Sequence, residues 1–386
     1  MATPIPANAM SRLPRSGIRR VFDEASKYPD CIRLEVGEPS FSTPEHVKAA
    51  ARAAMAANFT RYTPNAGILE LREAIVEKVM HRNKLSVTAD EVVVTNGGVE
   101  AVFTTLAALV NPGDEVLISD PSWPNYLQMT VVLGVQAVYY PLKLENDLVP
   151  TIADIEAKIT PHTKVLIVNS PGNPTGSSIP ESRQREILEL ARKQNLWIIS
   201  DEVYDEIYFE NPPVSMQSLD SDRRVITVFS FSKTYAMTGW RVGYLVGPRE
   251  IASHILRVQE PVTSCVNSVA QKAAVAALTG DQSCVAEMRS AYATRAKLVI
   301  SILDEFDVPY ARPSGAFYTM VDITRSGLSD MDFVSRMITE RRVAVVPGSA
   351  FGPNSGAFVR VSLASSEDDL TLGVTRIGEA INDWRR

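Results

Sequence analysis

The chain is poor in cysteine and histidine. Its 386 residues include three cysteines, Cys31, Cys265 and Cys284, and four histidines, all widely scattered. An odd number of distant cysteines argues against a disulfide framework and suits buried thiols in a reducing compartment. Because no two histidines have metal-ligand spacing, we expect no metal site. The cytoplasm is the expected location.

The chain also lacks an excess of positive charge and any long hydrophobic run. Its net charge of −6 gives no electrostatic footprint for nucleic acid or for an anionic membrane surface, so neither is expected as a partner. No stretch reaches the roughly 18 consecutive apolar residues of a spanning helix. The most basic segment, Arg12 to Arg20, has no apolar core after it, which favours a mobile or partner-contacting arm over a signal peptide.

Strand-like and helix-like segments alternate through the middle of the chain. The strand-like runs are continuously apolar, which indicates a mostly parallel sheet covered by helices on both faces, the α/β class. The expected strands are 91–95, 115–119, 137–142, 165–168, 196–200, 225–231 and 242–246, and the expected helices are 69–79, 99–110, 125–133, 152–159 and 181–194. Ligands of such sheets bind beyond the carboxyl ends of the strands.

The pattern changes near residue 280 and predicts a smaller α+β domain. A long helix is expected over 283–306, then strands at 317–321, 343–346 and 358–363, a helix at 330–340 and a last helix. We therefore divide the chain into an N-terminal arm that packs on the small domain (1–44), a large domain (45–282) and the small domain (283–386).

A lysine stands at the end of a buried strand near the middle of the chain. The apolar run 225–229 leads into Ser230-Phe231-Ser232-Lys233, and Arg241 follows eight positions after the lysine. Desolvation favours the neutral amine, which is the form that attacks a carbonyl. Ser230, Ser232 and Arg241 are groups that could hold a phosphate beside it. A phosphorylated aldehyde that a lysine holds covalently is pyridoxal phosphate, and we expect it as the cofactor.

Asp201 and Tyr204 follow another buried strand. A carboxylate there could keep the cofactor's ring nitrogen protonated, and a phenol one turn later could donate to the ring hydroxyl. Alone, Asp201 would be interpreted as a helix cap, and Lys233 changes that interpretation. Asn173 lies in the rigid loop Asn-Ser-Pro-Gly-Asn-Pro-Thr-Gly (169–176), either as a plain turn or as a contact to the ring hydroxyl and a substrate carboxylate.

Other candidates are weaker when taken one at a time. Gly97 and Gly98 form a strand–glycine–helix junction that could bind phosphate through free backbone N–H groups, or could be an ordinary turn. Trp123 could stack on the cofactor ring or fill the core. A buried Arg360 needs either a substrate carboxylate or a structural ion pair. Gly37 fits either a plain turn or a place where the backbone approaches that carboxylate closely. Tyr62 lies on a loop, where it could be an ordinary exposed aromatic residue.

Together these motifs resemble a known family. Ser-Phe-Ser-Lys-Thr-Tyr-Ala-Met-Thr-Gly-Trp-Arg-Val-Gly-Tyr (230–244) is similar to the lysine signature of class I/II aminotransferases, which are fold type I pyridoxal phosphate enzymes. The loop 169–176 matches too, and the resemblance spans from Val36-Gly37-Glu38-Pro39 to Arg360 in the family's order. It implies a large domain with a seven-stranded sheet and an aminotransferase that moves an amino group between an L-amino acid and a 2-oxo acid.

The resemblance also implies a role for each site residue. Lys233 would bind the cofactor covalently, take the Cα proton of the amino acid and return it to the former aldehyde carbon. Tyr62 would reach the phosphate of a neighbouring subunit, which implies a homodimer with shared active sites. The remaining residues are Asp201 for the ring nitrogen, Tyr204 and Asn173 for the ring hydroxyl, Trp123 for stacking, Gly97, Gly98, Val99, Ser230 and Arg241 for the phosphate, and Gly37, Asn173 and Arg360 for the substrate carboxylate.

The substrate and the reaction keep alternatives. Family members that act on aspartate or glutamate carry an extra cation, in one subgroup a lysine in the helix after the glycine junction, and 99–110 contains no Lys or Arg. Arg19 or Arg20 could replace it. The same cofactor residues serve lyases, oxidases and other Cα-carbanion chemistry, which is the second candidate function. A non-catalytic regulator is disfavoured because no basic DNA-binding module is present.

Overall fold

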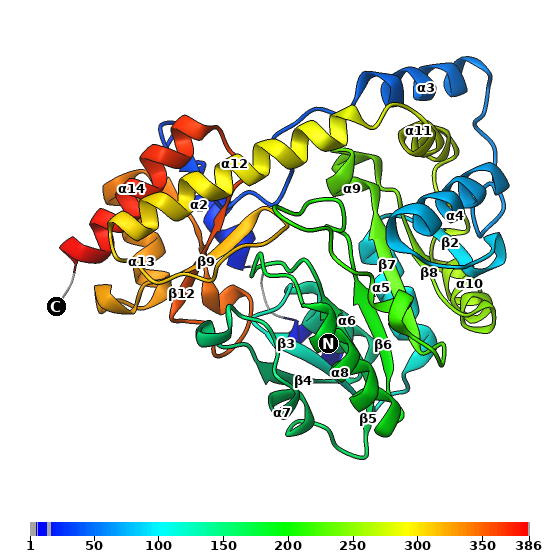
Figure 1. Ribbon diagram of the computed structural model, residues 1–386, viewed down its shortest axis with the longest axis horizontal. Coiled ribbons are helices and arrows are strands. Elements are labelled where there is room, and N and C mark those ends of the chain that lie inside the picture. The colour runs from blue at the N-terminus through cyan, green and yellow to red at the C-terminus, as the bar shows by residue number, and fades with distance from the viewer. Residues whose placement is uncertain (1–4, 6, 14–16, 385–386) are drawn as a thin grey trace, which may run out of the picture.

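The computed structural model describes residues 5, 7–13 and 17–384, and its centre is a seven-stranded sheet (Figure 1). All neighbouring strands run parallel except β8, which is antiparallel to both β2 and β7. The predicted mostly parallel α/β sheet is therefore confirmed. In spatial order the strands are β2 (Val92–Thr95), β8 (Gly243–Val246), β7 (Val225–Ser230), β6 (Trp197–Asp201), β5 (Thr163–Asn169), β3 (Glu115–Asp120) and β4 (Gln136–Pro141).

Helices cover both faces of this sheet. In β2, Val93 belongs to the core under one set of helices, whereas Val92 and Val94 belong to the core on the opposite face. A strand buried on both sides needs apolar residues at every position, which explains the unbroken runs. The first face is covered by α5 (Gly98–Leu109), α6 (Asn125–Leu133) and α10 (Arg249–Thr263), and the second by α4 (Leu69–Asn83), α11 (Ser268–Thr279), α7 (Ile152–Glu156) and α8 (Glu181–Lys193).

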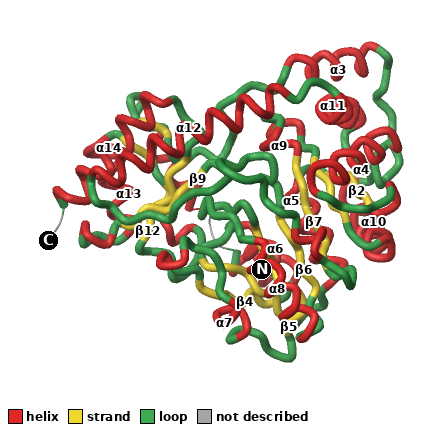
Figure 2. Tube along the Cα trace, in the orientation of Figure 1, coloured by secondary structure: helices red, strands yellow, loops and turns green. Residues whose placement is uncertain are grey.

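A smaller α+β part follows the sheet, as predicted (Figure 2). Its three antiparallel strands are β11 (Val346–Pro347), β12 (Phe358–Ser362) and β9 (Tyr318–Asp322), and its helices are α12 (Ser283–Glu305), α13 (Asp330–Arg336) and α14 (Glu367–Asp383). β1 (Ile32–Arg33) pairs in parallel with β10 (Val343–Ala344), and α2 (Gly17–Ala25) also contacts this part. The remaining helices are α1 (Asn8–Arg12), α3 (Glu45–Ala56) and α9 (Phe231–Thr234).

The chain passes from the larger to the smaller part along α12 (Figure 1). The boundaries expected after residues 44 and 282 stay predictions. Of the basic segment 12–20, residues 14–16 lie outside the described residues, and its flanks belong to α1 and α2. Among the described helices, none has the length and apolar character needed to cross a membrane.

Candidate active site

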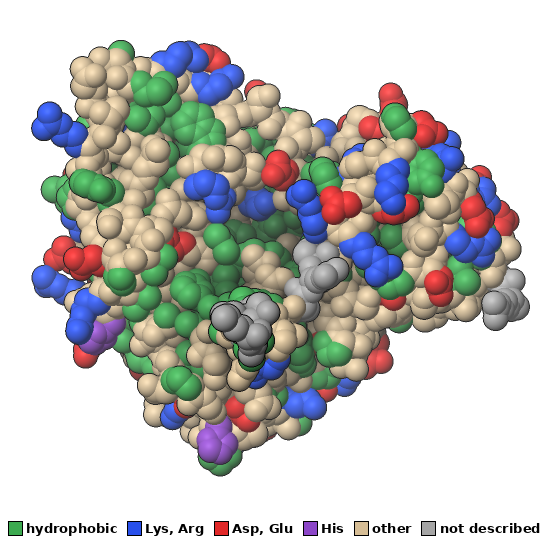
Figure 3. All heavy atoms as spheres, turned by 180° about the vertical axis from the view of Figure 1, so that it is seen from behind, with side chains coloured by type: hydrophobic (Ala, Val, Ile, Leu, Met, Phe, Trp, Pro, Cys, Tyr) green, Lys and Arg blue, Asp and Glu red, His purple; other side chains and the backbone are tan. Residues whose placement is uncertain are grey.

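A cavity of about 310 Å³ lies beyond the carboxyl ends of the central strands, where the larger and smaller parts meet. Figure 3 shows the molecule hollowed between these two parts. Most of the residues singled out in the sequence line this one cavity: Gly37, Gly98, Val99, Trp123, Asn173, Asp201, Tyr204, Ser230, Lys233, Arg241 and Arg360. Gly97 lies directly behind the lining, and Tyr62 is not part of it.

Lys233 enters the cavity from α9, the short helix that follows β7. Its Nζ atom donates a hydrogen bond to the carbonyl oxygen of Gly37 at 2.7 Å. Burial lowers the pKa of Lys233 to about 8, because a cation is poorly solvated there. About a tenth of the amine is therefore neutral at pH 7, far more than for a free lysine, and the neutral amine is the nucleophile.

Asp201 is the last residue of β6, and its carboxylate is buried. The Tyr126 hydroxyl donates to Oδ2 of Asp201 at 2.6 Å, and the backbone N–H of Val203 approaches Oδ1 at 3.3 Å. Burial raises the pKa of Asp201 to about 6, while these hydrogen bonds and Lys233 oppose the rise. The carboxylate remains mainly ionised at pH 7 and can hold a protonated nitrogen.

The Tyr204 hydroxyl lies 3.2 Å from the hydroxyl of Tyr318, which belongs to β9. The ring of Tyr318 in turn lies under the guanidinium of Arg360, 4.3 Å from its centroid. Sequence reasoning assigned no role to Tyr318 or Tyr126. The available sequence signal for Tyr126 was its position three residues after Trp123. In the structure the two rings meet edge to face, with their centroids 5.4 Å apart.

Arg360 is a buried cation whose partners are all neutral. Its Nη1 donates to Oδ1 of Asn173 at 3.0 Å, and its Nη2 donates to the carbonyl oxygen of Glu35 at 2.7 Å. Its Nε is buried and has no hydrogen-bond partner among the described residues. The Glu35 carboxylate is engaged by Arg33 instead. A buried guanidinium that lacks a carboxylate partner in the described chain can bind one from a substrate.

The glycine junction and Arg241 form the basic end of the cavity. Gly97 has a φ of +80° and is the N-cap residue of α5. The backbone N–H groups in the first turn of α5 have no partner within the helix and can bind an anion. A Cβ atom at Gly97 would lie 2.6 Å from Nη2 of Arg241, which shows how closely the guanidinium approaches the turn. Ser230 contributes a hydroxyl that accepts the N–H of Ser232 at 3.1 Å. This arrangement suits a phosphate dianion.

Tyr62 lies apart from the cavity, and its side chain is 93% exposed. The cavity is also lined by Ser232, which the sequence offered as a phosphate-binding group. Further lining residues had no predicted role: Ile18, Glu38, Tyr126, Asn169, Val203, Thr238 and Tyr318. Glu38 is adjacent to Gly37, so proximity to a predicted residue was the available signal for it. Ile18 directly precedes Arg19, a candidate substrate-binding cation, and that proximity was the available signal for Ile18.

The residues present fit pyridoxal phosphate. One cavity brings together a partly neutral lysine, a buried carboxylate and an anion-binding turn with its guanidinium. The orphaned Nε of Arg360 marks a second anion position on the side of the smaller part. No group of three or more His, Cys, Asp or Glu side chains in the described chain is arranged to hold a metal ion.

Comparison with known proteins identifies the class. Residues 29–377 match the family model described as aminotransferase class I and II. The chain is 39% identical over 373 residues to an aspartate aminotransferase of Pyrococcus abyssi, covering 95% of this chain and 96% of that protein. It is 37% identical, with the same coverage, to aromatic-amino-acid aminotransferase 2 of Thermococcus litoralis.

Solved structures agree. Aspartate aminotransferase from Thermus thermophilus with maleate superimposes with a TM-score of 0.93 at 36% identity, over 98% of this chain and 100% of that one. The chain belongs to the class I and II aminotransferases and has their fold type I architecture. It is a pyridoxal phosphate-dependent aminotransferase whose substrates are amino acids and 2-oxo acids.

Proposed function

We propose that Lys233 is the catalytic residue of this aminotransferase and that the cavity around it is the active site. The observation that carries the proposal is the meeting of Lys233, Asp201 and Arg241 in one cavity. Lys233 would hold the cofactor covalently, Asp201 its ring nitrogen, and Gly97, Gly98, Val99, Ser230 and Arg241 its phosphate. Tyr204 and Asn173 would contact the ring hydroxyl, and Trp123 would stack on the ring.

Bound pyridoxal phosphate supplies an aldehyde that condenses with amines and a ring that accepts the electron pair left at Cα. The protein's part is to bind, orient and move protons. Arg360, with Asn173 and the backbone of Gly37, would fix the α-carboxylate of the substrate and so aim Cα at Lys233. The Nζ atom of Lys233, deprotonated at modest cost because its pKa is about 8, would accept the Cα proton.

We also propose a homodimer in which Tyr62 completes the partner's site. Tyr62 is exposed, yet its loop is rigidly held. Gln271 donates to Oγ1 of Thr63 at 2.9 Å, and Gln259 donates to the carbonyl oxygen of Asn65 at 3.1 Å. The same end of the molecule, built from α3, α4, α10 and α11 (Figure 1), carries the exposed apolar side chains Met55, Leu69 and Val262. A dimer interface at this end would cover these exposed apolar groups.

The amino donor is open to direct measurement. In the described lining, Lys233, Arg241 and Arg360 are the cations, and each already has a proposed role. Aspartate, an aromatic amino acid and a small neutral one should each be mixed with the holoenzyme while the cofactor's visible band is followed. A transaminase loses the band with a good donor and regains it with a 2-oxo acid. Turnover without any 2-oxo acid would instead indicate lyase chemistry.

The location proposed for the enzyme is the cytoplasm. The three scattered cysteines, which remain free thiols in the fold, support a reducing compartment. Fractionation of the source cells would test this location.

A further inference from the structure

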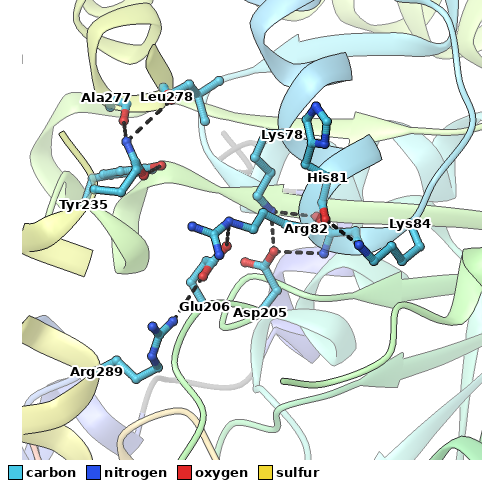
Figure 4. Close-up of polar contacts among 12 residues, drawn as sticks. Lys78, His81, Arg82, Lys84, Asp205, Glu206, Tyr235, Ala277, Leu278 and Arg289 are labelled. Atoms are coloured by element: carbon cyan, nitrogen blue, oxygen red, sulfur yellow. Dashed lines mark hydrogen bonds and ion pairs between the residues drawn. The ribbon is translucent and has the colours of Figure 1, made fainter. Parts of the chain in front are cut away.

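A second polar cluster lies behind the active site, outside the cavity. It consists of Lys78 and Asn83 on α4 and Asp205 after β6. Figure 4 shows Lys78 and Asp205 pointing toward one another, with Glu206 beside them turned toward Arg82 and Arg289. Nothing in the proposed chemistry uses any of these groups, so their burial calls for an explanation.

The three side chains of the cluster bind one another and are largely buried. Lys78 and Asp205 form an ion pair, Lys78 also donates to Oδ1 of Asn83 at 2.9 Å, and Nδ2 of Asn83 donates to Asp205 at 3.1 Å. The side chains of Lys78 and Asp205 are 12% and 7% exposed. Burial opposes the charge on Lys78, but Asp205, Tyr244 and Glu206 together outweigh burial, so the pKa of Lys78 lies above its usual value. A buried pair of this kind adds little net stability compared with apolar residues of the same volume, so stability alone does not account for it.

The position of the cluster connects it to the cofactor-binding groups. Tyr204 and Asp205 are adjacent in two successive tight turns, in which the N–H of Asp205 donates to the carbonyl of Glu202 at 3.0 Å and that of Ile207 to the carbonyl of Tyr204 at 2.8 Å. The Tyr204 side chain lines the cavity, whereas the Asp205 side chain contacts α4. The ion pair therefore ties to α4 the short segment of backbone that carries the Tyr204 phenol.

Lys78 touches the other side of the site as well. Its ammonium lies 4.5 Å from the centroid of the Phe229 ring, on the strand that leads to Ser230 and Lys233. One side chain thus contacts both segments from which the cofactor-binding groups project. In the described chain, the titratable and charged groups that face Tyr204 include Tyr318, Asp201, Arg360, Lys233 and Tyr126, and none of these belongs to the cluster.

We propose that the Lys78–Asp205 pair is a positioning element that holds the Tyr204 phenol at the cofactor's ring oxygen. This inference rests on the proposed function, in which Tyr204 donates to that oxygen. A donor there favours the anionic oxygen, which accompanies the unprotonated state of the Lys233 linkage, and so lowers the pKa of that linkage. A misplaced phenol raises it.

The test is a pH titration of the visible absorption band of the holoenzyme, read with the thermal midpoint. Tyr204→Phe sets the full upward shift of the titration midpoint. Lys78→Met and Asp205→Asn should both shift the midpoint upward, by part of that amount. In the Lys78→Met/Tyr204→Phe double variant, the midpoint should equal that of Tyr204→Phe alone, because the pair acts through the phenol. Lys84→Met, at an exposed lysine of the same helix end, should leave the midpoint unchanged.

Three outcomes would overturn the inference. Shifts of opposite sign in Lys78→Met and Asp205→Asn would mean that the bare charges act through space, since one variant leaves a buried anion and the other a buried cation. A lower thermal midpoint with an unmoved titration would mean a purely structural role. Additive shifts in the double variant would separate the pair from Tyr204. If Lys78→Met does not fold, the titration midpoint of Asp205→Asn is compared with that of Asp205→Glu. Asp205→Glu keeps the charge and should restore the wild-type midpoint. If the wild-type protein with added pyridoxal phosphate shows no visible band at all, the proposed function itself is refuted.

Discussion

Burial sets the pKa of Lys233, the residue we propose as catalytic, and it also affects the stability of the fold. Its amine is enclosed by protein, and its only hydrogen-bond acceptor in the described chain is the neutral carbonyl of Gly37. The carboxylate of Asp201 lies in the same cavity but is bound by Tyr126. Burial without a close counter-ion explains the lowered pKa of Lys233. It also makes the free energy of unfolding depend on pH.

In the cofactor-free protein, this pH dependence of the free energy of unfolding should be measurable between pH 8 and 10.5. The pKa of Lys233 is about 8 when folded and 10.5 as a free group, so the unfolded chain binds more protons in that interval. The free energy of unfolding should rise with pH there, by on the order of 3 kcal/mol in total.

Lys233→Met should lack this rise. The measurement is urea unfolding of both cofactor-free proteins at several pH values, taken as the difference between them so that other groups cancel. A constant difference across the interval would contradict the buried, weakly paired amine.

Arg360 allows a second residue-scale prediction. Arg360→Lys keeps the charge but loses the two-pronged geometry that matches a carboxylate. We expect KM for the amino acid and the 2-oxo acid to rise by roughly 10- to 100-fold, with a smaller effect on cofactor affinity. Steady-state kinetics and a cofactor titration measure the two effects. Equal losses in both would mean that Arg360 shapes the whole cavity rather than the substrate position.

The sequence predicted the residues that have distinctive motifs and missed those that act through packing. Asp201 ends a strand, Lys233 follows one and Asn173 lies in a specific loop. These three and Arg360, which lies within a strand, converge on one cavity. Tyr318 lies in a strand whose apolar pattern looks like ordinary core, and its contacts with Tyr204 and Arg360 arise only from tertiary structure. Pattern cannot reveal such neighbours.

At the scale of elements, the buried strands were predicted well because each is a short apolar run between turn signals. The helix 125–133 has the bounds of α6. Helices α3, α10 and α11 were not assigned, although the alanine content of α3 and α11 favours helix. Helix α10 contains Pro261 near its C-terminal end. The helix expected over 330–340 is instead α13 followed by a short π-helix at Met337–Arg341. The antiparallel direction of β8 depends on its neighbours and has no sequence signature.

The close contact between β8 and the Gly97–Gly98 junction, which we propose binds the phosphate, gives an element-scale prediction. A Cβ atom at Gly243 would lie 2.6 Å from the carbonyl carbon of Gly97 and 2.7 Å from the nitrogen of Gly98. Gly243→Ala should therefore displace the turn and weaken cofactor binding by about tenfold or more, since 1.4 kcal/mol is sufficient for that. Equilibrium dialysis against pyridoxal phosphate measures it.

Gly239→Ala is the matched control. Gly239 lies near Arg241, and a Cβ atom there would meet nothing within 4 Å. Its cofactor affinity should match that of the wild type. Equal weakening in both variants would contradict the role given to the close approach of β8.

At the scale of the whole molecule, the site depends on both parts of the chain. Lys233, Asp201 and Arg241 come from the larger part, and Arg360 and Tyr318 from the smaller one. The sequence predicted the two parts from the change of pattern near residue 280. It could not show how they face one another, because that arrangement depends on packing between segments far apart in the chain.

The shared-site dimer can be tested by mixing two inactive subunits. In a hybrid of Lys233→Ala and Tyr62→Ala subunits, one of the two sites combines an intact Lys233 with the partner's intact Tyr62. Random reassortment should then restore up to about a quarter of the wild-type activity at low cofactor concentration. Activity assays before and after unfolding and refolding the mixture measure it. No recovery, with hybrid dimers shown by mass, would place Tyr62 outside the partner's site.

The central claim is that Lys233 carries the cofactor. Borohydride reduction of the holoenzyme should make the linkage permanent, and mass spectrometry of the digested protein then identifies the modified residue. The account predicts a single phosphopyridoxyl group on the peptide that contains Lys233, and none on that peptide after prior treatment with an amino donor. A modification confined to any other lysine would contradict it.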